Sequence, residues 1–193
     1  CAWNEAMIKD LQNLYVHLVG KLEWADEKFN GTTWVPDPMP GAGETVGHTI
    51  FIATNDTNEN VAKTLYHEYQ HARAPYAYRS KSWTDEETRV YTMETNWAIS
   101  RGLTPDPTLT KTDPKSGKTV TDPAKVSSTV TSYPGLDTAS PGEVEAKVGR
   151  KKVRVRMPDN SVKVRKAKKG DTVPGRRKIT KPHKRVRKHE WKC

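Results

Sequence analysis

The sequence has few of the residues from which disulfide frameworks and thiolate metal sites are built. It contains two cysteines, Cys1 and Cys193, which are the first and last of its 193 residues. Two thiols exclude a four-cysteine zinc site and a dense disulfide framework. A disulfide between Cys1 and Cys193 requires the two ends of the chain to meet, and the sequence leaves that pairing open.

Long apolar runs are absent, and apolar residues are scarce overall. No run approaches the roughly 20 apolar residues of a membrane-spanning helix, and no signal-peptide pattern opens the chain. Because the chain starts at Cys1 rather than at Met, we expect the natural N-terminus to lie upstream. Hydrophobic residues make up only 34% of the chain, so we expect one modest domain with an appendage.

Acidic residues are nearly missing from the last quarter of the chain. Residues 147–193 contain 20 Lys and Arg against 3 Asp and Glu, whereas residues 1–146 contain 13 against 20. Such a charge division indicates an acidic partner for the basic tail. The candidate partners are nucleic acid, an anionic membrane, a cell wall or an acidic protein.

Local patterns predict a mostly helical α+β core with a small sheet or edge strand. Apolar residues recur at three- and four-residue steps from Trp3 to Leu22, which is typical of an amphipathic helix. Thr84 and Glu87 have the spacing of a capping box at the start of another helix. The predicted elements are a helix at 2–29, a strand at 48–53, a helix from 58–60 to 73 and a helix from 84 to 102.

The remainder of the chain is predicted to be a linker and a basic tail. Residues rich in Thr, Pro and Ser indicate a linker or a draped loop with one short helix near 124–130. Alternating Val and cationic residues around Pro158-Asp159 predict a β-hairpin with one apolar and one basic face, and the last stretch should be extended or disordered without a partner. The expected division is a core at 1–103, a linker at 104–146 and a basic hairpin and tail at 147–193.

One short motif in the helix predicted near residues 58–73 carries catalytic chemistry. Residues 67–71 read His-Glu-Tyr-Gln-His, which is the pattern H-E-x-x-H. Residues four apart lie on one face of a helix, so His67 and His71 can bind the same zinc ion while Glu68 acts on a water. The alternative is that both histidines are solvated residues on the polar face of the helix.

The motif and the strand before it resemble the zincin metallopeptidases over residues 48–101. In these enzymes an edge strand precedes the H-E-x-x-H helix and presents its backbone to an extended substrate. Metzincins would have Gly at 74 and His at 77, where this chain has Ala74 and Ala77. No histidine occurs between His71 and His183, so the chain is more similar to the gluzincins, in which a glutamate of the next helix is the third zinc ligand.

This resemblance implies a third ligand from the helix predicted to start at residue 84. Glu87 is preferred because Glu87-Thr-Arg-Val-Tyr91 is similar to the E-x-x-A-Y pattern found downstream of many H-E-x-x-H motifs. Glu94 and Glu86 are the alternatives, and Asp85 is the least favoured. Glu87 could instead serve only in the capping box with Thr84.

The ligands imply a hydrolytic mechanism. Two imidazoles and one carboxylate leave zinc a position for water, whose pKa falls towards roughly 7 on the metal. Glu68 is expected to take the proton of this water and to pass it to the leaving amine. The donor that stabilises the oxyanion stays open. The candidates for that role are Tyr76, Tyr78, Tyr91, Tyr133 and His48.

The sequence therefore predicts a zinc-dependent endopeptidase that acts on polypeptides. Its size and motif resemble the metallopeptidase toxin domains of secreted effectors, which implies a soluble protein delivered from bacteria or phage and an inhibitor or parent protein as a partner. One alternative is a metallopeptidase that cleaves cell-wall peptides. An alternative of a different class is a non-catalytic polyanion-binding or virion structural protein with an inert motif.

Overall fold

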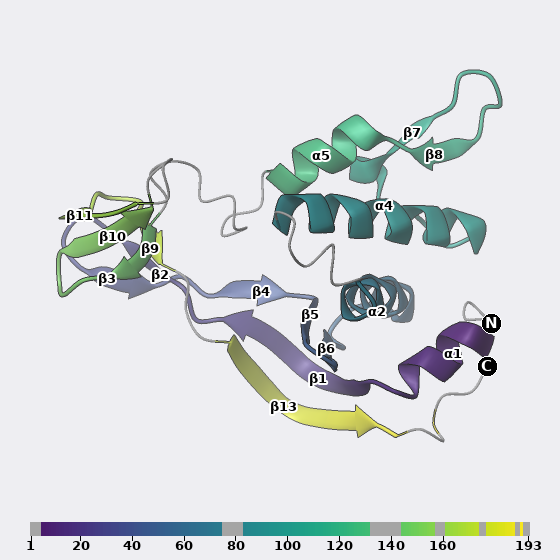
Figure 1. Cartoon of the computed structure of the whole chain (residues 1–193), viewed down its shortest axis with the longest axis horizontal. Helices are drawn as coiled ribbons and strands as arrows, with labels where there is room; N and C mark the ends of the chain where they lie inside the picture. Colours follow the sequence, from purple (N-terminus) through teal and green to yellow (C-terminus); the bar gives the residue numbers. More distant parts are fainter. Residues whose placement is uncertain are drawn as a thin grey trace.

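The computed structural model of the chain describes residues 5–74, 83–131, 144–156, 161–173, 177–187 and 190. Figure 1 shows a sheet accompanied by helices at one end of the molecule and a lobe of short strands at the other end. The lobe is joined to the sheet by the long strand β1 (Tyr15–Trp24) and the segments that follow it.

The described elements divide between these two regions. The helices are α1 (Glu5–Leu11), α2 (Asn58–Ala72), α4 (Trp83–Ser100) and α5 (Pro123–Thr131). The main sheet contains β1, β4 (Met39–Gly41), β5 (Gly43–Val46), β6 (Thr49–Ala53) and β13 (Arg177–Val186). The lobe contains β2 (Glu27–Phe29), β3 (Trp34–Pro36), β9 (Val144–Lys147), β10 (Lys152–Arg156), β11 (Val162–Lys166) and β12 (Thr172–Val173). The short helix η1 (Pro107–Leu109) and the hairpin β7 (Thr110–Thr112) with β8 (Thr119–Thr121) precede α5.

The prediction of a mostly helical core with a small sheet is wrong. Five strands form the main sheet, in which β13, β1, β6 and β5 are neighbours in that order and β4 also pairs with β1. β1 and β6 are parallel, whereas β13 and β5 run antiparallel to their neighbours. β6 is the strand next to the edge strand β5 and is followed directly by α2. The H-E-x-x-H helix therefore starts beside a substantial sheet.

The helix predicted over residues 2–29 is also wrong, because among the described residues there only Glu5–Leu11 form an α-helix. Val16, Val19 and Leu22 of β1 are fully buried at three-residue steps, which imitate a helical pattern. The pairing of β1 with β13 shifts its register just after Val19. The extra residue of this bulge lies on β13. In β1 itself, Val16 packs in the cluster with the helices, whereas Val19 and Leu22 pack with Ala53 in a second cluster, so the strand buries apolar side chains in two places.

The apolar core lies between the sheet and the helices α1, α2 and α4. Tyr66 of α2 stacks on Trp97 of α4, with ring centroids 4.5 Å apart and planes inclined by 11°. Each fully buried aliphatic side chain in such a core contributes roughly 1.5–3 kcal/mol. The buried core residues are Met7, Leu11, Val16, Ile50, Ile52, Leu65, Tyr66, Tyr69, Ala72, Trp97 and Ala98. This packing fixes the rotation of α2 about its axis.

Several local predictions are confirmed. The strand predicted at 48–53 is β6, and the two helices predicted after it are α2 and α4. The short helix predicted near 124–130 is α5. Residues 107–131, predicted as part of a linker or draped loop, form regular elements that pack on α4. The contacts are made by Leu109, Val126 and Val130 against Tyr91.

The predicted hairpin of β10 and β11 is present, but its two faces are not one apolar and one basic. Residues directly opposite each other in an antiparallel pair share a face. Val153 is opposite Arg165, and Arg154 is opposite Val164, so each face carries both kinds of residue. The length of the connection between two strands sets their register, and the alternating pattern alone does not specify it.

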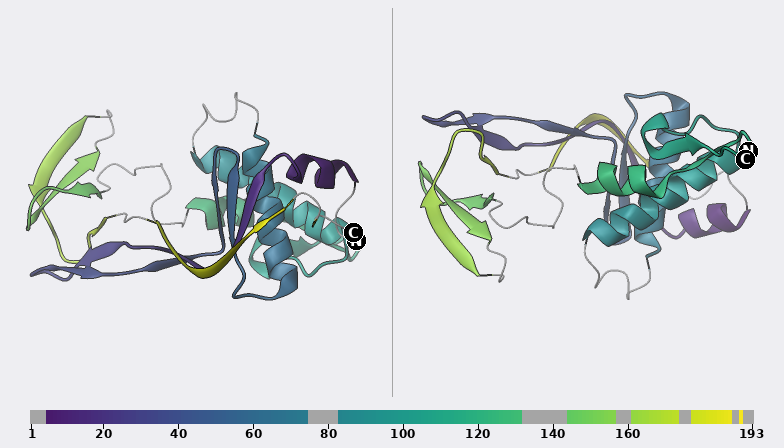
Figure 2. Two further views of the ribbon diagram at one scale, coloured as in Figure 1. Left: turned by 90° about the horizontal axis from the view of Figure 1, so that it is seen from below. Right: turned by 90° about the horizontal axis from the view of Figure 1, so that it is seen from above.

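Strand β13, near the end of the basic tail, forms one edge of the main sheet. β13 lies beside β1 along most of its length (Figure 2), with Val186 opposite Val16 and Ile179 opposite Leu22. Ile179 and Val186 also pack against buried residues of the sheet. This stretch is therefore ordered by backbone pairing within the chain.

Two further predictions concern the chain ends and membranes. Cys1 and Cys193, whose pairing the sequence leaves open, lie outside the described residues. Among the helices that the structure describes, none combines the length and the apolar character needed to cross a bilayer.

Candidate metal centre

α2 directs the two histidines of the motif towards α4. Thr57 caps the helix by accepting a hydrogen bond from the N–H of Asn60 at 3.2 Å. Tyr69, between the histidines in sequence, is buried in the core, so His67 and His71 lie on a different face. Their Nε2 atoms are 3.1 Å apart, so both rings point to the same place.

Glu87 of α4 completes a cluster with these two imidazoles. Its Oε2 lies 3.3 Å from Nε2 of His67, and its Oε1 lies 3.0 Å from Nε2 of His71. One potential ligand atom from each of the three residues lies within 4.8 Å of the others. Two imidazoles and one carboxylate are the protein ligands of a major class of catalytic zinc sites, so these residues fit a zinc ion.

The capping box predicted between Thr84 and Glu87 is not formed. α4 begins at Trp83, so Thr84 lies inside its first turn. The hydroxyl of Thr84 is buried without a hydrogen-bond partner in the described part of the chain. The carboxylate of Glu87 faces the histidines instead, which removes the competing structural explanation for this residue.

Glu94 and Glu86, the other two candidates for the third ligand, lie behind the imidazole rings. Oε2 of Glu94 is 2.9 Å from Nδ1 of His67, and Oε1 of Glu86 is 3.3 Å from Nδ1 of His71. A carboxylate that accepts from Nδ1–H fixes the tautomer and orientation of a metal-binding histidine. The three glutamates thus take different places, with Glu87 alone facing both Nε2 atoms.

Arg89 anchors one of these supporting carboxylates. Its Nε donates to Oε2 of Glu86 at 2.9 Å, and its Nη2 donates to Oε1 at 2.7 Å. The same Nη2 also donates to the carbonyl of Gln70 at 3.1 Å, which ties α4 to α2. Burial acts to raise the pKa of Glu86, but the hydrogen bonds from Arg89 outweigh it and the pKa is lowered. Glu86 therefore stays charged behind His71.

The close contacts shift the pKa values of the cluster itself. Burial is the strongest influence on His67 and opposes its charge, but hydrogen bonds to Glu87 and Glu94 outweigh it and raise the pKa to about 10. Burial likewise opposes the charge of Glu87, yet hydrogen bonds to His67 and His71 lower its pKa to about 2. These contacts favour a proton on His67 when no cation is bound, and a metal ligand must give up that proton.

Glu68 lies on the side of α2 that faces β5. The hydroxyl of Thr45 is 2.8 Å from Oε2 of Glu68 and 2.9 Å from its backbone carbonyl, so its single proton lies within reach of both acceptors. Burial of the carboxyl raises the pKa of Glu68 above its ordinary value. A carboxylate that is held in place and has a raised pKa suits a general base near neutral pH.

Gly43 allows β5 to approach Glu68 closely. A Cβ atom at Gly43 would lie 2.7 Å from Cγ of Glu68 and 2.8 Å from its Oε1. It would also lie 2.7 Å from Cγ2 of Thr64. Sequence reasoning did not identify Gly43 or Thr45 as part of the site. Gly43 lies before the strand predicted at 48–53 and not next to it, so the only available signal was that a glycine often marks a close approach of other atoms.

The structure describes two of the candidate oxyanion donors, Tyr91 and His48. The ring of Tyr91 packs edge-on against His67, with centroids 4.5 Å apart. His48 is exposed in the turn before β6, and Asp85, the least favoured ligand candidate, is exposed on α4. Three further candidates, Tyr76, Tyr78 and Tyr133, lie outside the described residues.

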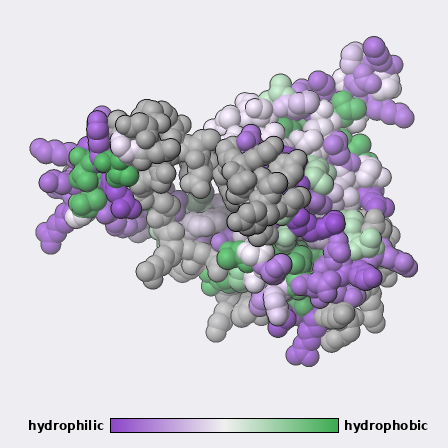
Figure 3. Space-filling view, viewed as in Figure 1, coloured by the Kyte–Doolittle hydropathy of each residue, from purple (hydrophilic) through white to green (hydrophobic). Residues whose placement is uncertain are grey.

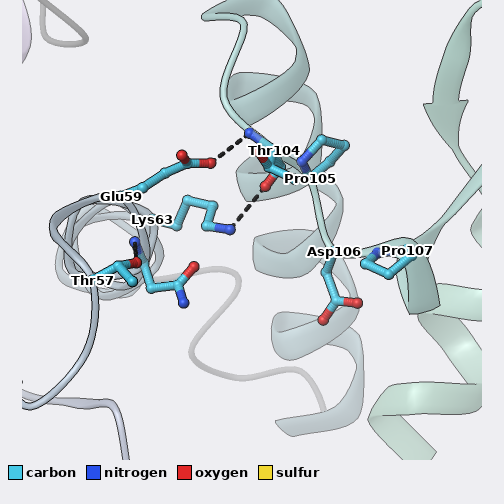
Figure 4. Close-up of a pocket in the computed structure, with 8 residues that line it drawn as sticks. Thr57, Glu59, Lys63, Thr104, Pro105, Asp106 and Pro107 are labelled. Carbon is cyan, nitrogen blue, oxygen red and sulfur yellow. Dashed lines mark hydrogen bonds between the residues drawn. The ribbon is translucent and has the colours of Figure 1, made fainter.

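A separate hollow of about 390 Å³ lies at the N-terminal end of α2 (Figure 4). Glu59 accepts a hydrogen bond from the N–H of Thr104, and Nζ of Lys63 donates to the carbonyl of Thr104 at 2.8 Å. These contacts attach the segment after α4 to the start of α2. None of the residues that line this hollow belongs to the histidine cluster. The contacts of Glu59 and Lys63 with Thr104 hold the start of the helix that carries the cluster.

Comparison with known proteins identifies no relative of the chain. No protein-family model, no curated protein and no solved structure matches it. The resemblance to zincins therefore stays a prediction from the H-E-x-x-H motif and the order of strand and helix.

Proposed function

We propose that this protein is a zinc-dependent endopeptidase. His67, His71 and Glu87 are the proposed zinc ligands, and Glu68 is the proposed general base. The main support for the proposal is that the carboxylate oxygens of Glu87 lie 3.3 Å from Nε2 of His67 and 3.0 Å from Nε2 of His71. The carboxylates behind both rings add support, because such contacts orient histidines that bind metals.

The chemistry proposed for the site is hydrolysis of a peptide bond. Zinc bound there would polarise the peptide carbonyl and activate a water. Glu68 removes a proton from the attacking water and delivers it to the leaving amine. Thr45 keeps the Glu68 carboxylate in place through its hydrogen bond, so the base does not have to be ordered during the reaction.

β5 supports a polypeptide as the substrate. It is the last strand in the order β13-β1-β6-β5, so within the described residues one side of its backbone is not used by the sheet. An extended peptide can add to such an edge through main-chain hydrogen bonds. Because Gly43 and Thr45 of β5 contact Glu68, a peptide bound along this edge would pass close to the proposed base.

The proposal includes the partners expected from the basic tail. Nucleic acid, a cell wall or an acidic protein would each match the charge of residues 147–193. Action as a secreted effector or toxin domain, with an inhibitor or a parent protein as partner, stays a prediction.

Metal analysis tests the proposed function directly. The purified full-length chain should contain about one zinc ion per molecule after incubation with zinc and desalting. It should cleave unfolded casein, lose this activity in a chelator and regain it when zinc is restored. A chain that holds no zinc and cleaves nothing would instead support the non-catalytic alternative.

Replacing Glu94 with Gln is expected to weaken zinc binding about 10-fold, because the amide holds Nδ1 of His67 less strongly than a carboxylate does. The affinity should be measured by competition with a chromophoric chelator. Asp85→Asn is the matched control, since it removes the same charge from an exposed position of α4. Equal zinc affinity of Glu94→Gln and the control would show that Glu94 does not support the site.

A further inference from the structure

The register of β10 and β11 gathers cationic side chains on one face of the lobe. Lys152 is opposite Lys166, and Arg154 is opposite Val164. Even-numbered residues of both strands therefore share a face, because the residues directly opposite each other do. The described even-numbered side chains on this outer face are Lys152, Arg154, Val162, Val164 and Lys166. None of them is acidic.

The outer face is open to solvent. Val162 and Val164 are 48% and 55% exposed, whereas Val153 and Val155 of the opposite face are 0% and 3% exposed. Figure 3 shows hydrophobic atoms of the lobe surrounded by strongly hydrophilic ones. Both views of Figure 2 place this sheet at the end of the molecule away from α2 and α4. A large ligand can thus reach the outer face from solvent.

Two cationic residues of the inner face, Arg165 and Lys147, are paired within the lobe. Nη1 and Nη2 of Arg165 bind the two carboxylate oxygens of Asp171 at 2.6 and 2.9 Å. Lys147 of β9 is paired with Glu27 of β2. The acids that these contacts use are therefore not placed to neutralise Lys152 and Lys166, which are exposed at the end of the hairpin opposite its turn.

The composition of this surface distinguishes between classes of anionic partner. The described residues 144–156 and 161–173 contain no aromatic residue and no Leu, Ile or Met. Amphipathic helices that bind membrane surfaces insert Trp, Phe or Leu, and protein interfaces are enriched in aromatic residues and depleted in Lys. Single-stranded nucleic acids are usually bound by stacking on aromatic rings. Contacts to the phosphates of a duplex require only Lys and Arg.

We propose that the outer face of β10 and β11 binds the phosphate backbone of double-stranded DNA without regard to sequence. A β-ribbon fits the major groove of B-form DNA, whereas the corresponding groove of duplex RNA is too narrow for side chains to read. Lys152, Arg154 and Lys166 make the phosphate contacts. This inference does not depend on the proposed peptidase activity.

The test is a titration of a fluorescent DNA duplex of about 20 base pairs with the full-length chain at several salt concentrations, followed by anisotropy. The triple variant K152Q/R154Q/K166Q should bind at least about 10-fold more weakly. The dependence of log K on log salt should also become less steep, by roughly 0.9 for each of the three phosphate contacts that are lost. The charge-preserving variant K152R/R154K/K166R should bind as the unmodified chain does.

A matched control removes three exposed lysines from the β7–β8 hairpin. The variant K111Q/K115Q/K118Q has the same net charge as the triple variant of the lobe, and these residues are exposed. It should change DNA affinity less than about 2-fold, because charges far from the contact are screened by salt. Equal loss in both triple variants, or no loss in the lobe variant, overturns the proposal. It is also overturned if the chain binds vesicles of anionic phospholipid through these residues but does not bind the duplex.

Discussion

Replacing Glu68 with Gln should eliminate peptide hydrolysis while zinc stays bound. The amide has nearly the same shape as the carboxylate but cannot accept the proton of the attacking water. A lost general base typically costs about 10²- to 10⁴-fold in rate. His67, His71 and Glu87 make the proposed metal contacts without Glu68, so the zinc content should be unchanged. Casein cleavage and metal content should be measured on the same preparation.

Glu59→Gln provides the control for this variant. Glu59 is a half-buried glutamate in the first turn of the same helix, and its amide replacement retains an oxygen that can accept from Thr104. This variant should cleave at the normal rate. If Glu68→Gln retained full activity, Glu68 could not be the base. If expression of the chain arrests bacterial growth, the arrest should disappear with Glu68→Gln, as the effector prediction requires.

Replacing Gly43 with Ala is expected to lower kcat/KM about 100-fold, because a displacement of a catalytic group by about 1 Å can have an effect of this size. The new methyl group would lie 2.7–2.8 Å from atoms of Glu68 and 2.7 Å from Thr64. The carboxylate of Glu68 must then move away from its hydrogen bond with Thr45. Zinc content should stay the same, since the three atoms nearest to the added methyl group belong to Glu68 and Thr64 and not to a proposed ligand.

The neighbouring substitution Ala42→Ser tests whether any enlargement of this segment has the same effect. Ala42 is exposed, so an added hydroxyl should leave hydrolysis unchanged. Thermal unfolding of both variants should be compared, because overpacking alone costs about 1–3 kcal/mol. Full activity of Gly43→Ala, or loss of zinc together with activity, would contradict a specific displacement of Glu68.

Local sequence patterns were sufficient where an element is defined by its own residues. The strand at β6 has bounding turns, and α2 has a cap at Thr57, so both were predicted. The motif fixed the positions of His67, Glu68 and His71 on one helix. The sequence also reduced the third ligand to glutamates of the next helix, three of which lie around the two imidazoles.

Patterns failed where the outcome depends on pairing between distant segments. β1 contributes Val16 to one buried cluster and Val19 and Leu22 to another, which gave it the apolar spacing of a helix, and no local feature of residues 177–186 indicates β1 as their partner. The same limitation concealed Thr45, because its contact with Glu68 requires β5 to lie beside α2. Which nitrogen each glutamate faces is likewise set by the packing of α4 on α2.

Pairing of Val16 with Val186 affects when the main sheet can be completed during synthesis of the chain. Contacts between residues so far apart form late, since they require the closure of a very long loop. While the nascent chain is still on the ribosome, the motif helix is translated long before the strand that closes the sheet. We therefore expect the main sheet to be completed only after residues 177–186 have left the ribosome, and the proposed hydrolysis to depend on that step.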